Sequence, residues 1–166
     1  MSESIRTAIE SAIGYLTEHP DEAAYTDSVA TATLVEGLRF RVEGADTTLE
    51  TDMSTSVGGT NSAPSAGWLF RAALASCVGT LVAMRAAQEG VGLSSLTVEV
   101  DSKSDDRGLL GMEPAIPAGP SSISIRVRAE SDASADTIRE IVEWGSDHCP
   151  VCDIAKRAVP VELEIG

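Results

Sequence analysis

The stretch "AGWLFRAALASCVGTLVAMRAAQE", residues 66–89, decides the fold. Apolar and small side chains surround nearly the whole circumference of this helical segment, and Gly90 supplies a stop signal after it. The uncharged run between Arg71 and Arg85 is shorter than the roughly 20 residues that a bilayer crossing requires. The sequence therefore predicts a helix buried at the centre of a fold.

Helix and strand signals precede this segment. A helix is predicted at residues 2–18, where apolar side chains recur at helical spacing until Pro20. Three strand-like segments follow, separated by short turns, at residues 28–35, 37–44 and 47–53. They predict an antiparallel meander. A loop rich in glycine, serine and proline then leads into the central helix.

Alternating segments follow the central helix. Residues 95–100 and 122–130 place apolar side chains at every second position, which predicts an antiparallel pair joined by a long loop at 104–120. Two helices are predicted after this pair, one at residues 135–145 and a short one that begins at Cys149.

The C-terminal segment alternates in the same way and predicts a last strand at residues 159–165, with Val161, Leu163 and Ile165 facing inward. The order of elements predicts an α+β fold in which a mostly antiparallel sheet packs on the long central helix. A length of 166 residues is typical of one domain, residues 1–166.

The charge balance excludes some partners. With 12 Lys and Arg against 26 Asp and Glu, the net charge of -14 repels phosphate backbones and anionic lipid surfaces. We therefore expect neither nucleic acid nor a membrane as a partner. The N-terminal residues lack the pattern of a secretory signal, which favours a cytoplasmic location. No phosphate-binding glycine motif occurs, and we expect no cofactor.

The segment "DHCPVCD", residues 147–153, holds two of the 3 cysteines and one of the 2 histidines. Proline suits the first helical position, which places Cys149 at the N-cap. There, backbone N–H groups and the helix dipole stabilise a thiolate, whose free pKa is about 8.5. His148 assists this thiol or simply caps. Cys152, one turn further on, is close enough to form a disulfide with Cys149 or to relay it.

Other interpretations of the cysteines stay open. Cys77 lies on an apolar stripe of the central helix, a setting typical of a plain core cysteine. Cys149 and Cys152 form a C-x-x-C motif suited to dithiol exchange, although they do not open the long helix of a βαβ unit. Cys77, His148, Cys149 and Cys152 are also ligand types of a tetrahedral zinc site, but a second ligand pair at the usual spacing is absent.

Three stretches, residues 62–87, 104–112 and 148–165, resemble the OsmC/Ohr family of osmotically inducible and organic-hydroperoxide-resistance proteins. The resemblance implies an OsmC-like core at residues 27–166, an N-terminal helical extension at residues 1–26, and an intertwined homodimer. Its two reactive cysteines match Cys77 and Cys149.

The resemblance also implies a reaction. The Cys77 thiolate would attack an organic hydroperoxide and become a sulfenic acid, which Cys149 would resolve as a disulfide. A dithiol reductant such as a lipoyl group would then restore both thiols. The apolar residues around Cys77 would favour organic peroxides over hydrogen peroxide.

Two positions depart from the family pattern. Peroxidase members hold the reactive thiolate with an arginine, which a glutamate upstream of the first cysteine orients; here that position is Gly67. Arg39 and Arg41 share one face of a predicted strand, and either could supply the guanidinium. Cys152 stands where the family usually has serine or another small residue.

The resulting hypothesis is a thiol-dependent peroxidase with Cys77, Cys149 and the additional thiol Cys152 as its site. The alternative is a non-catalytic or redox-sensing homodimeric module that binds a hydrophobic small molecule.

Overall fold

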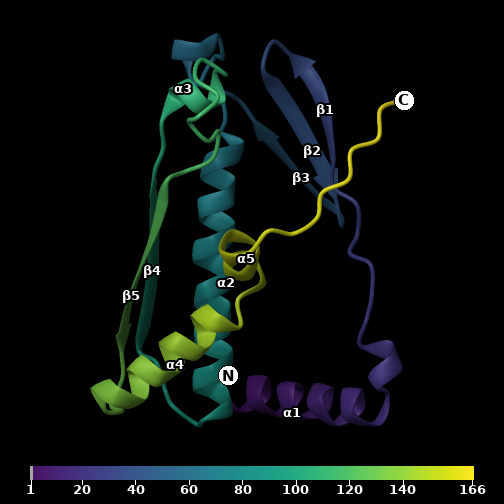
Figure 1. Ribbon diagram of the computed structural model, residues 1–166. Coiled ribbons are helices and arrows are strands. Elements are labelled where there is room, and N and C mark those ends of the chain that lie inside the picture. The colour runs from purple at the N-terminus through teal and green to yellow at the C-terminus, as the bar shows by residue number, and fades with distance from the viewer. Residues whose placement is uncertain (1) are drawn as a thin grey trace. The chain divides into compact units, whose positions relative to one another are not determined.

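The computed structural model describes residues 2–166 (Figure 1). The chain forms two compact units. The larger joins residues 2–12 to residues 71–166, and the smaller comprises residues 13–70. Helices and antiparallel strands are present in the arrangement that an α+β fold requires, so the predicted fold class is confirmed.

The central helix α2 (Ala66–Gln88) gives the larger unit one row of buried side chains. Leu74, Val78, Val82 and Ala86, spaced by four, are each at most 2% exposed and form the core together with Ile141. Within this unit the other side chains of α2, Ala87 excepted, are half-buried or exposed. The helix is long and apolar enough to cross a membrane, but its buried row belongs to a helix-and-sheet core, as predicted.

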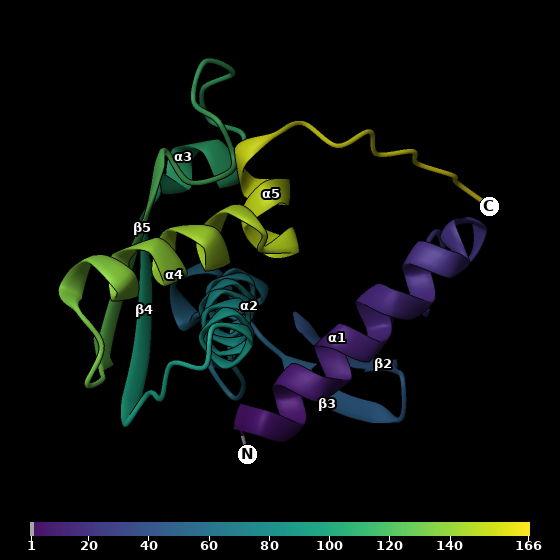
Figure 2. The same cartoon turned by 90° about the horizontal axis from the view of Figure 1, so that it is seen from below.

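A two-stranded antiparallel sheet lies beside α2. Its strands are β4 (Ser95–Lys103) and β5 (Ser122–Glu130). Figure 2 looks along α2 and shows this strand pair next to it. Helix α4 (Ala135–Asp147) passes across the two strands in this view. Register pairs such as Val98 with Val127 and Val100 with Ile125 place the predicted apolar face on the core. Strand β4 runs beyond its apolar alternation because its polar end still pairs through the backbone with the start of β5.

Two local features position the segment after α4. The Ser134 hydroxyl accepts a hydrogen bond from the Thr137 N–H and begins the helix. At Gly145, α4 approaches α2 so closely that an added Cβ would lie 2.7 Å from Val82 Cγ2 and 2.9 Å from the Val82 backbone nitrogen. Only glycine fits this crossing, which delivers the chain to helix α5 (Pro150–Lys156) beside α2.

The predicted loop 104–120 contains one short helix, α3 (Asp106–Leu109). The Asp105 side chain accepts a hydrogen bond from the Arg107 N–H at 3.1 Å and caps it. The Arg107 guanidinium returns to Asp105 and reaches Glu113.

The smaller unit contains the predicted meander. Its strands are β1 (Thr31–Glu36), β2 (Arg39–Gly44) and β3 (Thr47–Thr51), all antiparallel. Helix α1 (Ser2–Glu18), shared between the units, ends before Pro20 as predicted. One sheet face is apolar, with Leu34 opposite Phe40 and Val42 opposite Leu49, and within this unit it is open: Leu34 is 57% exposed.

The loop after β3 is organised by a buried carboxylate. Asp52, 3% exposed, accepts hydrogen bonds from the backbone and side chains of Thr60 and Ser62 and from the Met53 N–H. The hydrogen bond from the Thr60 hydroxyl contributes most, and with the hydrogen bonds from backbone N–H groups it holds the pKa of Asp52 well below its usual range. The glycine-rich segment is therefore a folded loop.

The predicted C-terminal strand at residues 159–165 is wrong for this structure. The segment is outside any helix or strand, and the side chains expected to face inward, Val161, Leu163 and Ile165, are 90%, 84% and 88% exposed. Alternation gives a strand an apolar face, but a strand exists only when a second backbone pairs with it. Among residues 2–166 this segment has no such partner.

Candidate active site

Cys149 begins α5. It is the N-cap residue, its extended backbone precedes Pro150 at the first helical position, and its Sγ accepts a hydrogen bond from the Cys152 N–H at 3.4 Å. The predicted cap is therefore confirmed. The side chain has no solvent exposure and belongs to the core cluster.

The second thiol at this place comes from α2. The Cys77 thiol lies close enough to Cys149 to affect its ionisation. Burial, followed by the interaction with the Cys77 thiol, raises the pKa of the Cys149 thiol; the backbone N–H groups of α5 oppose the rise. Both cysteines are free, and Cys77 is half-buried whereas Cys149 is buried. The pair thus combines one accessible sulfur with one shielded sulfur.

Cys152 lies in the first turn of α5 and is 4% exposed. The Ser146 Oγ is 3.9 Å from its Sγ. The Lys156 ammonium donates a hydrogen bond to Asp147 at 3.2 Å and lies beside the Cys152 thiol; both groups raise the pKa of Lys156, and Asp147 contributes most. A cationic donor therefore faces the third thiol.

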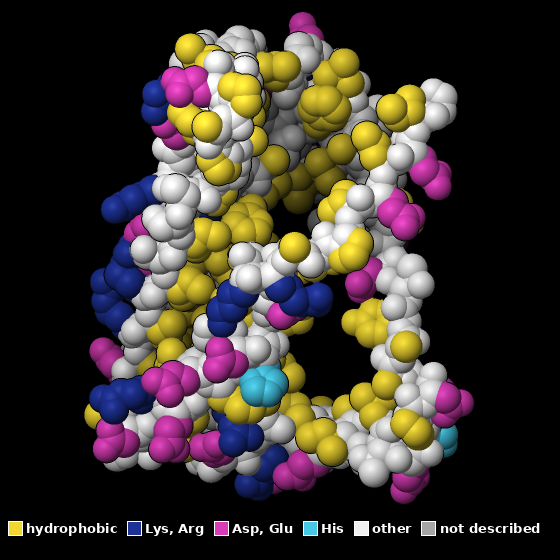
Figure 3. All heavy atoms as spheres, in the orientation of Figure 1, with side chains coloured by type: hydrophobic (Ala, Val, Ile, Leu, Met, Phe, Trp, Pro, Cys, Tyr) yellow, Lys and Arg dark blue, Asp and Glu magenta, His cyan; other side chains and the backbone are white. Residues whose placement is uncertain are grey.

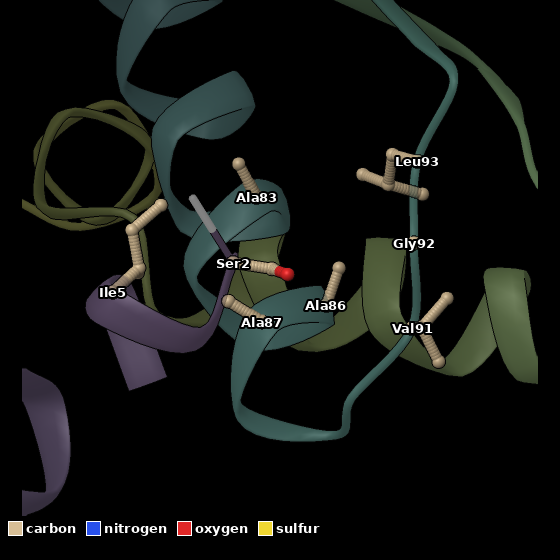
Figure 4. A pocket seen from close by; sticks show the side chains of 8 residues that line it. All are labelled: Ser2, Ile5, Ala83, Ala86, Ala87, Val91, Gly92 and Leu93. Carbon is tan, nitrogen blue, oxygen red and sulfur yellow. The ribbon is translucent and has the colours of Figure 1, made fainter. Parts of the chain in front are cut away.

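A cavity of about 350 Å³ lies elsewhere in the larger unit, where the first turn of α1 meets the C-terminal end of α2 (Figure 4). Its walls are apolar apart from the Ser2 hydroxyl, which points into the space. No titratable side chain lines it, so it offers room for an apolar ligand without groups for acid–base or thiol chemistry.

His148 is turned away from the thiols. Its ring is stacked on Trp144 with centroids 4.0 Å apart, and its Nδ1 lies 2.8 Å from the Trp144 carbonyl oxygen at the end of α4. Of the two predicted roles for His148, the structure shows capping. Across residues 2–166, no three His, Cys, Asp or Glu side chains are grouped so that they could hold a metal ion.

Arg71 on α2 and the candidates Arg39 and Arg41 on β2 make different contacts. The Arg71 guanidinium donates to the Ser102 hydroxyl on β4 at 3.4 Å. Arg39 and Arg41 are on one face of β2, as predicted, and Arg39 lies 3.9 Å from both Glu36 and Glu50. Gly67 is exposed in the first turn of α2 and brings no carboxylate. The part of Arg39 or Arg41 in the site stays a prediction.

Two residues near the thiols were missed by the sequence reasoning. Lys156 follows Cys152 by four positions, the spacing at which helical side chains meet, so this neighbour could have been found. Ser146 could not, because its approach to Cys152 depends on the turn between α4 and α5.

The family model described as OsmC-like protein matches residues 59–164. The chain belongs to the OsmC-like family. The match includes the three cysteines, the whole of α2 and the β4–β5 pair. No curated protein matches the chain.

Solved structures show the same fold. An OsmC-like protein from Mycoplasma pneumoniae has a TM-score of 0.68 at 16% identity, covering 80% of this chain and 89% of its own. An organic hydroperoxide resistance protein OsmC from Legionella pneumophila has a TM-score of 0.59 at 18% identity, covering 80% and 91%. An organic hydroperoxide resistance protein from Elizabethkingia anophelis has a TM-score of 0.58 at 15% identity, covering 81% and 91%.

Proposed function

We propose that the protein is a thiol-dependent peroxidase that reduces organic hydroperoxides, with Cys77 as the attacking and Cys149 as the resolving cysteine. The closeness of these two thiols carries the proposal, because a resolving cysteine must reach the oxidised sulfur. Membership of the family, and the hydroperoxide-resistance names of two proteins with the same fold, support the choice of substrate.

The reaction proceeds in three steps. The Cys77 thiolate attacks the distal peroxide oxygen, the O–O bond breaks, and the alkoxide takes up a proton and leaves as an alcohol. The sulfur, oxidised by two electrons, is now a sulfenic acid. The Cys149 sulfur attacks it, water leaves with the Cys149 proton, and the Cys77–Cys149 disulfide forms. A dithiol such as a lipoyl group reduces this disulfide by exchange and becomes a disulfide itself.

The environments of the two thiols suit these roles. Cys77 is half-buried on α2, so a peroxide can reach it while its tail contacts apolar side chains. Cys149 is buried, and its raised pKa keeps it protonated at neutral pH. Because the thiolate is the nucleophile, Cys149 is protected from direct oxidation until Cys77 has reacted.

One element of the family pattern is missing. Gly67 supplies no carboxylate to orient an arginine, and Arg71 is engaged with Ser102. We therefore expect slower turnover than in relatives that keep the glutamate, with Arg39 or Arg41 as the candidate guanidinium.

We also propose a cytoplasmic homodimer. Each unit leaves apolar surface open: the β1–β3 face carries Leu34, and the C-terminal segment exposes Val161, Leu163 and Ile165. A second copy would supply the backbone that this alternating segment lacks. Light scattering tests the proposal: we expect the mass of two chains, and a shift to one chain when residues 161–166 are deleted.

Consumption of an alkyl hydroperoxide tests the enzymatic proposal. With cumene hydroperoxide and dithiothreitol, the wild-type protein should show catalysed turnover, faster than with hydrogen peroxide, and Cys77→Ser should reduce the rate to that of the uncatalysed reaction. Ser76→Ala, an exposed neighbour on α2, is the matched control and should keep the rate. Turnover that survives Cys77→Ser, or none in the folded wild-type protein, would overturn the proposal.

A binding module is the second candidate, and the apolar cavity between α1 and α2 favours it. An apolar fluorescent probe should then bind to the wild-type protein and bind more weakly to Ala83→Leu, which fills the cavity from α2. Equal binding to both proteins would contradict this function.

A further inference from the structure

The third thiol has an opening of its own. A cavity of about 320 Å³ lies between α2, β5 and α5, and Cys152 and Lys156 line it, whereas Cys77 and Cys149 do not. Its other walls are mainly apolar, with Leu74, Ile123 and Ile125 among them. Figure 3 shows hydrophobic side chains gathered in the hollow between β5 and α5, with Lys and Arg side chains beside it.

We propose that Cys152 is the exit thiol of the peroxidase: it takes the disulfide over from Cys77, and the resulting Cys149–Cys152 disulfide is reduced from this cavity by a dithiol with an apolar body. The inference rests on the proposed function and adds the residue and the place at which the reductant acts.

The backbone geometry of α5 suits the transfer. Cys149 is the N-cap and Cys152 lies one turn further on, near enough for the Cys152 N–H to donate to the Cys149 Sγ at 3.4 Å. Two cysteines in a C-x-x-C motif at a helix start form a disulfide without unfolding the helix. Cys149 is thus a neighbour of both other thiols, Cys77 and Cys152.

The charges around Cys152 suit an attacking thiol. Exchange requires a thiolate, and a neighbouring ammonium stabilises one. Lys156 supplies that charge beside Cys152 and is held in place by Asp147, and the Ser146 Oγ lies 3.9 Å from the Cys152 Sγ. The chain has lysine only at positions 103 and 156, and one of these two lysines lies beside Cys152.

The exchange balances without a further reactant. The Cys152 thiolate attacks the Cys149 sulfur of the Cys77–Cys149 disulfide, the bond between Cys77 and Cys149 breaks, and Cys77 leaves as a thiolate ready for the next peroxide. The external dithiol attacks Cys152 through the cavity, forms a mixed disulfide, and closes to its own disulfide. The dithiol gives up two electrons and two protons: the electrons reduce the bond between Cys149 and Cys152, one proton returns to Cys149, and the other replaces the proton that the alkoxide took up.

Trypsin cleavage distinguishes the two disulfides, because residues 72–85 carry Cys77 and residues 140–156 carry both Cys149 and Cys152. We would add a stoichiometric amount of cumene hydroperoxide to the reduced protein, block free thiols by alkylation, and map disulfides by mass spectrometry. In the wild-type protein we expect the bond within residues 140–156, with Cys77 alkylated. In Cys152→Ser we expect residues 72–85 cross-linked to residues 140–156.

The outcomes separate this inference from the proposed function. Alcohol release together with a persistent Cys77–Cys149 cross-link in the wild-type protein would overturn the relay and leave the peroxidase standing. Absence of alcohol would overturn the peroxidase. Oxidation with diamide needs no peroxidase activity and tests the disulfide transfer independently. A disulfide within residues 140–156 would support the relay, and a cross-link between residues 72–85 and 140–156 would overturn it.

Lys156→Met provides a kinetic test. Loss of the ammonium should slow reduction of the oxidised protein by dithiothreitol severalfold, because Cys152 leaves the mixed disulfide as a thiolate beside Lys156, with the oxidation rate unchanged. Lys103→Met, at the only other lysine, is the matched control and should change neither rate. Equal reduction rates for Lys156→Met and wild type would contradict the role of Lys156.

Discussion

Cys77 on α2 and Cys149 at the start of α5 lie close enough for their thiols to interact, and of the two Cys149 is buried whereas Cys77 is half-buried. The pairing depends on Gly145, because a side chain there would push α4, and α5 after it, away from Val82. A peroxide can therefore reach Cys77, whereas Cys149 is shielded from it.

Cys149→Ser should separate oxidation from resolution. The Cys77 thiolate still reacts, but without a resolving sulfur the sulfenic acid persists, and catalytic turnover with a dithiol should fall to near the uncatalysed rate. Dimedone labelling of residues 72–85 after hydroperoxide addition measures this product. A variant that turns over like the wild-type protein would exclude Cys149 as the resolving residue.

Gly145→Ala should destabilise the protein. The added methyl group would lie within van der Waals distance of Val82, and overpacking of this kind costs about 1–3 kcal/mol of unfolding free energy. Urea unfolding measures the change. Gly92→Ala is the control, since a Cβ there meets nothing within 4 Å; an effect as large as that of Gly145→Ala would show that the crossing is not tight.

The raised pKa of Cys149 predicts a loss of stability in alkali. Above the ordinary thiol pKa of 9.0, an unfolded chain loses this proton while the folded chain keeps it, so the folded state binds more protons and stability falls as the pH rises. The contribution is complete below 9.0 and is lost once the folded pKa is passed. Thermal melts should show a steeper alkaline decline for the wild-type protein than for Cys149→Ser. Parallel curves would contradict the shift.

The lowered pKa of Asp52 predicts a loss of stability in acid. Its pKa is lowered, so the stabilisation is present above the usual value of 3.8 and is lost as the pH falls below it. Asp52→Asn should melt at a lower temperature than the wild-type protein at neutral pH, and the difference should shrink in acid. Asp132→Asn, at an exposed aspartate, is the control. A difference that stays constant down to strongly acidic pH would rule out this role for the carboxylate.

The elements that could be predicted are those whose signal is local. Alternation in β4 and β5, the glycine-punctuated meander, and Pro150 after Cys149 each fix a conformation from neighbouring residues, and the structure contains all three. The approach of Cys77 to Cys149 joins distant segments, and only the resemblance to a family made it an expectation.

The C-terminal segment and the third thiol show where sequence reasoning stops. Val161, Leu163 and Ile165 have the right spacing for a strand, but pairing requires a backbone that residues 2–166 do not supply. The approach of Ser146 to Cys152 depends on the turn between α4 and α5, and the cavity beside Cys152 brings together side chains of α2, β5 and α5. No periodicity in the sequence encodes either feature.

Cys152→Ser allows the most direct test of the central claim, because it leaves Cys77 and Cys149 as the only thiols. After one stoichiometric addition of cumene hydroperoxide, alcohol and alkylatable thiol are counted in the same sample. The account predicts one alcohol released per chain, both cysteines protected, and residues 72–85 cross-linked to residues 140–156. Alcohol release with both thiols still open to alkylation, or a folded protein that releases none, would contradict it.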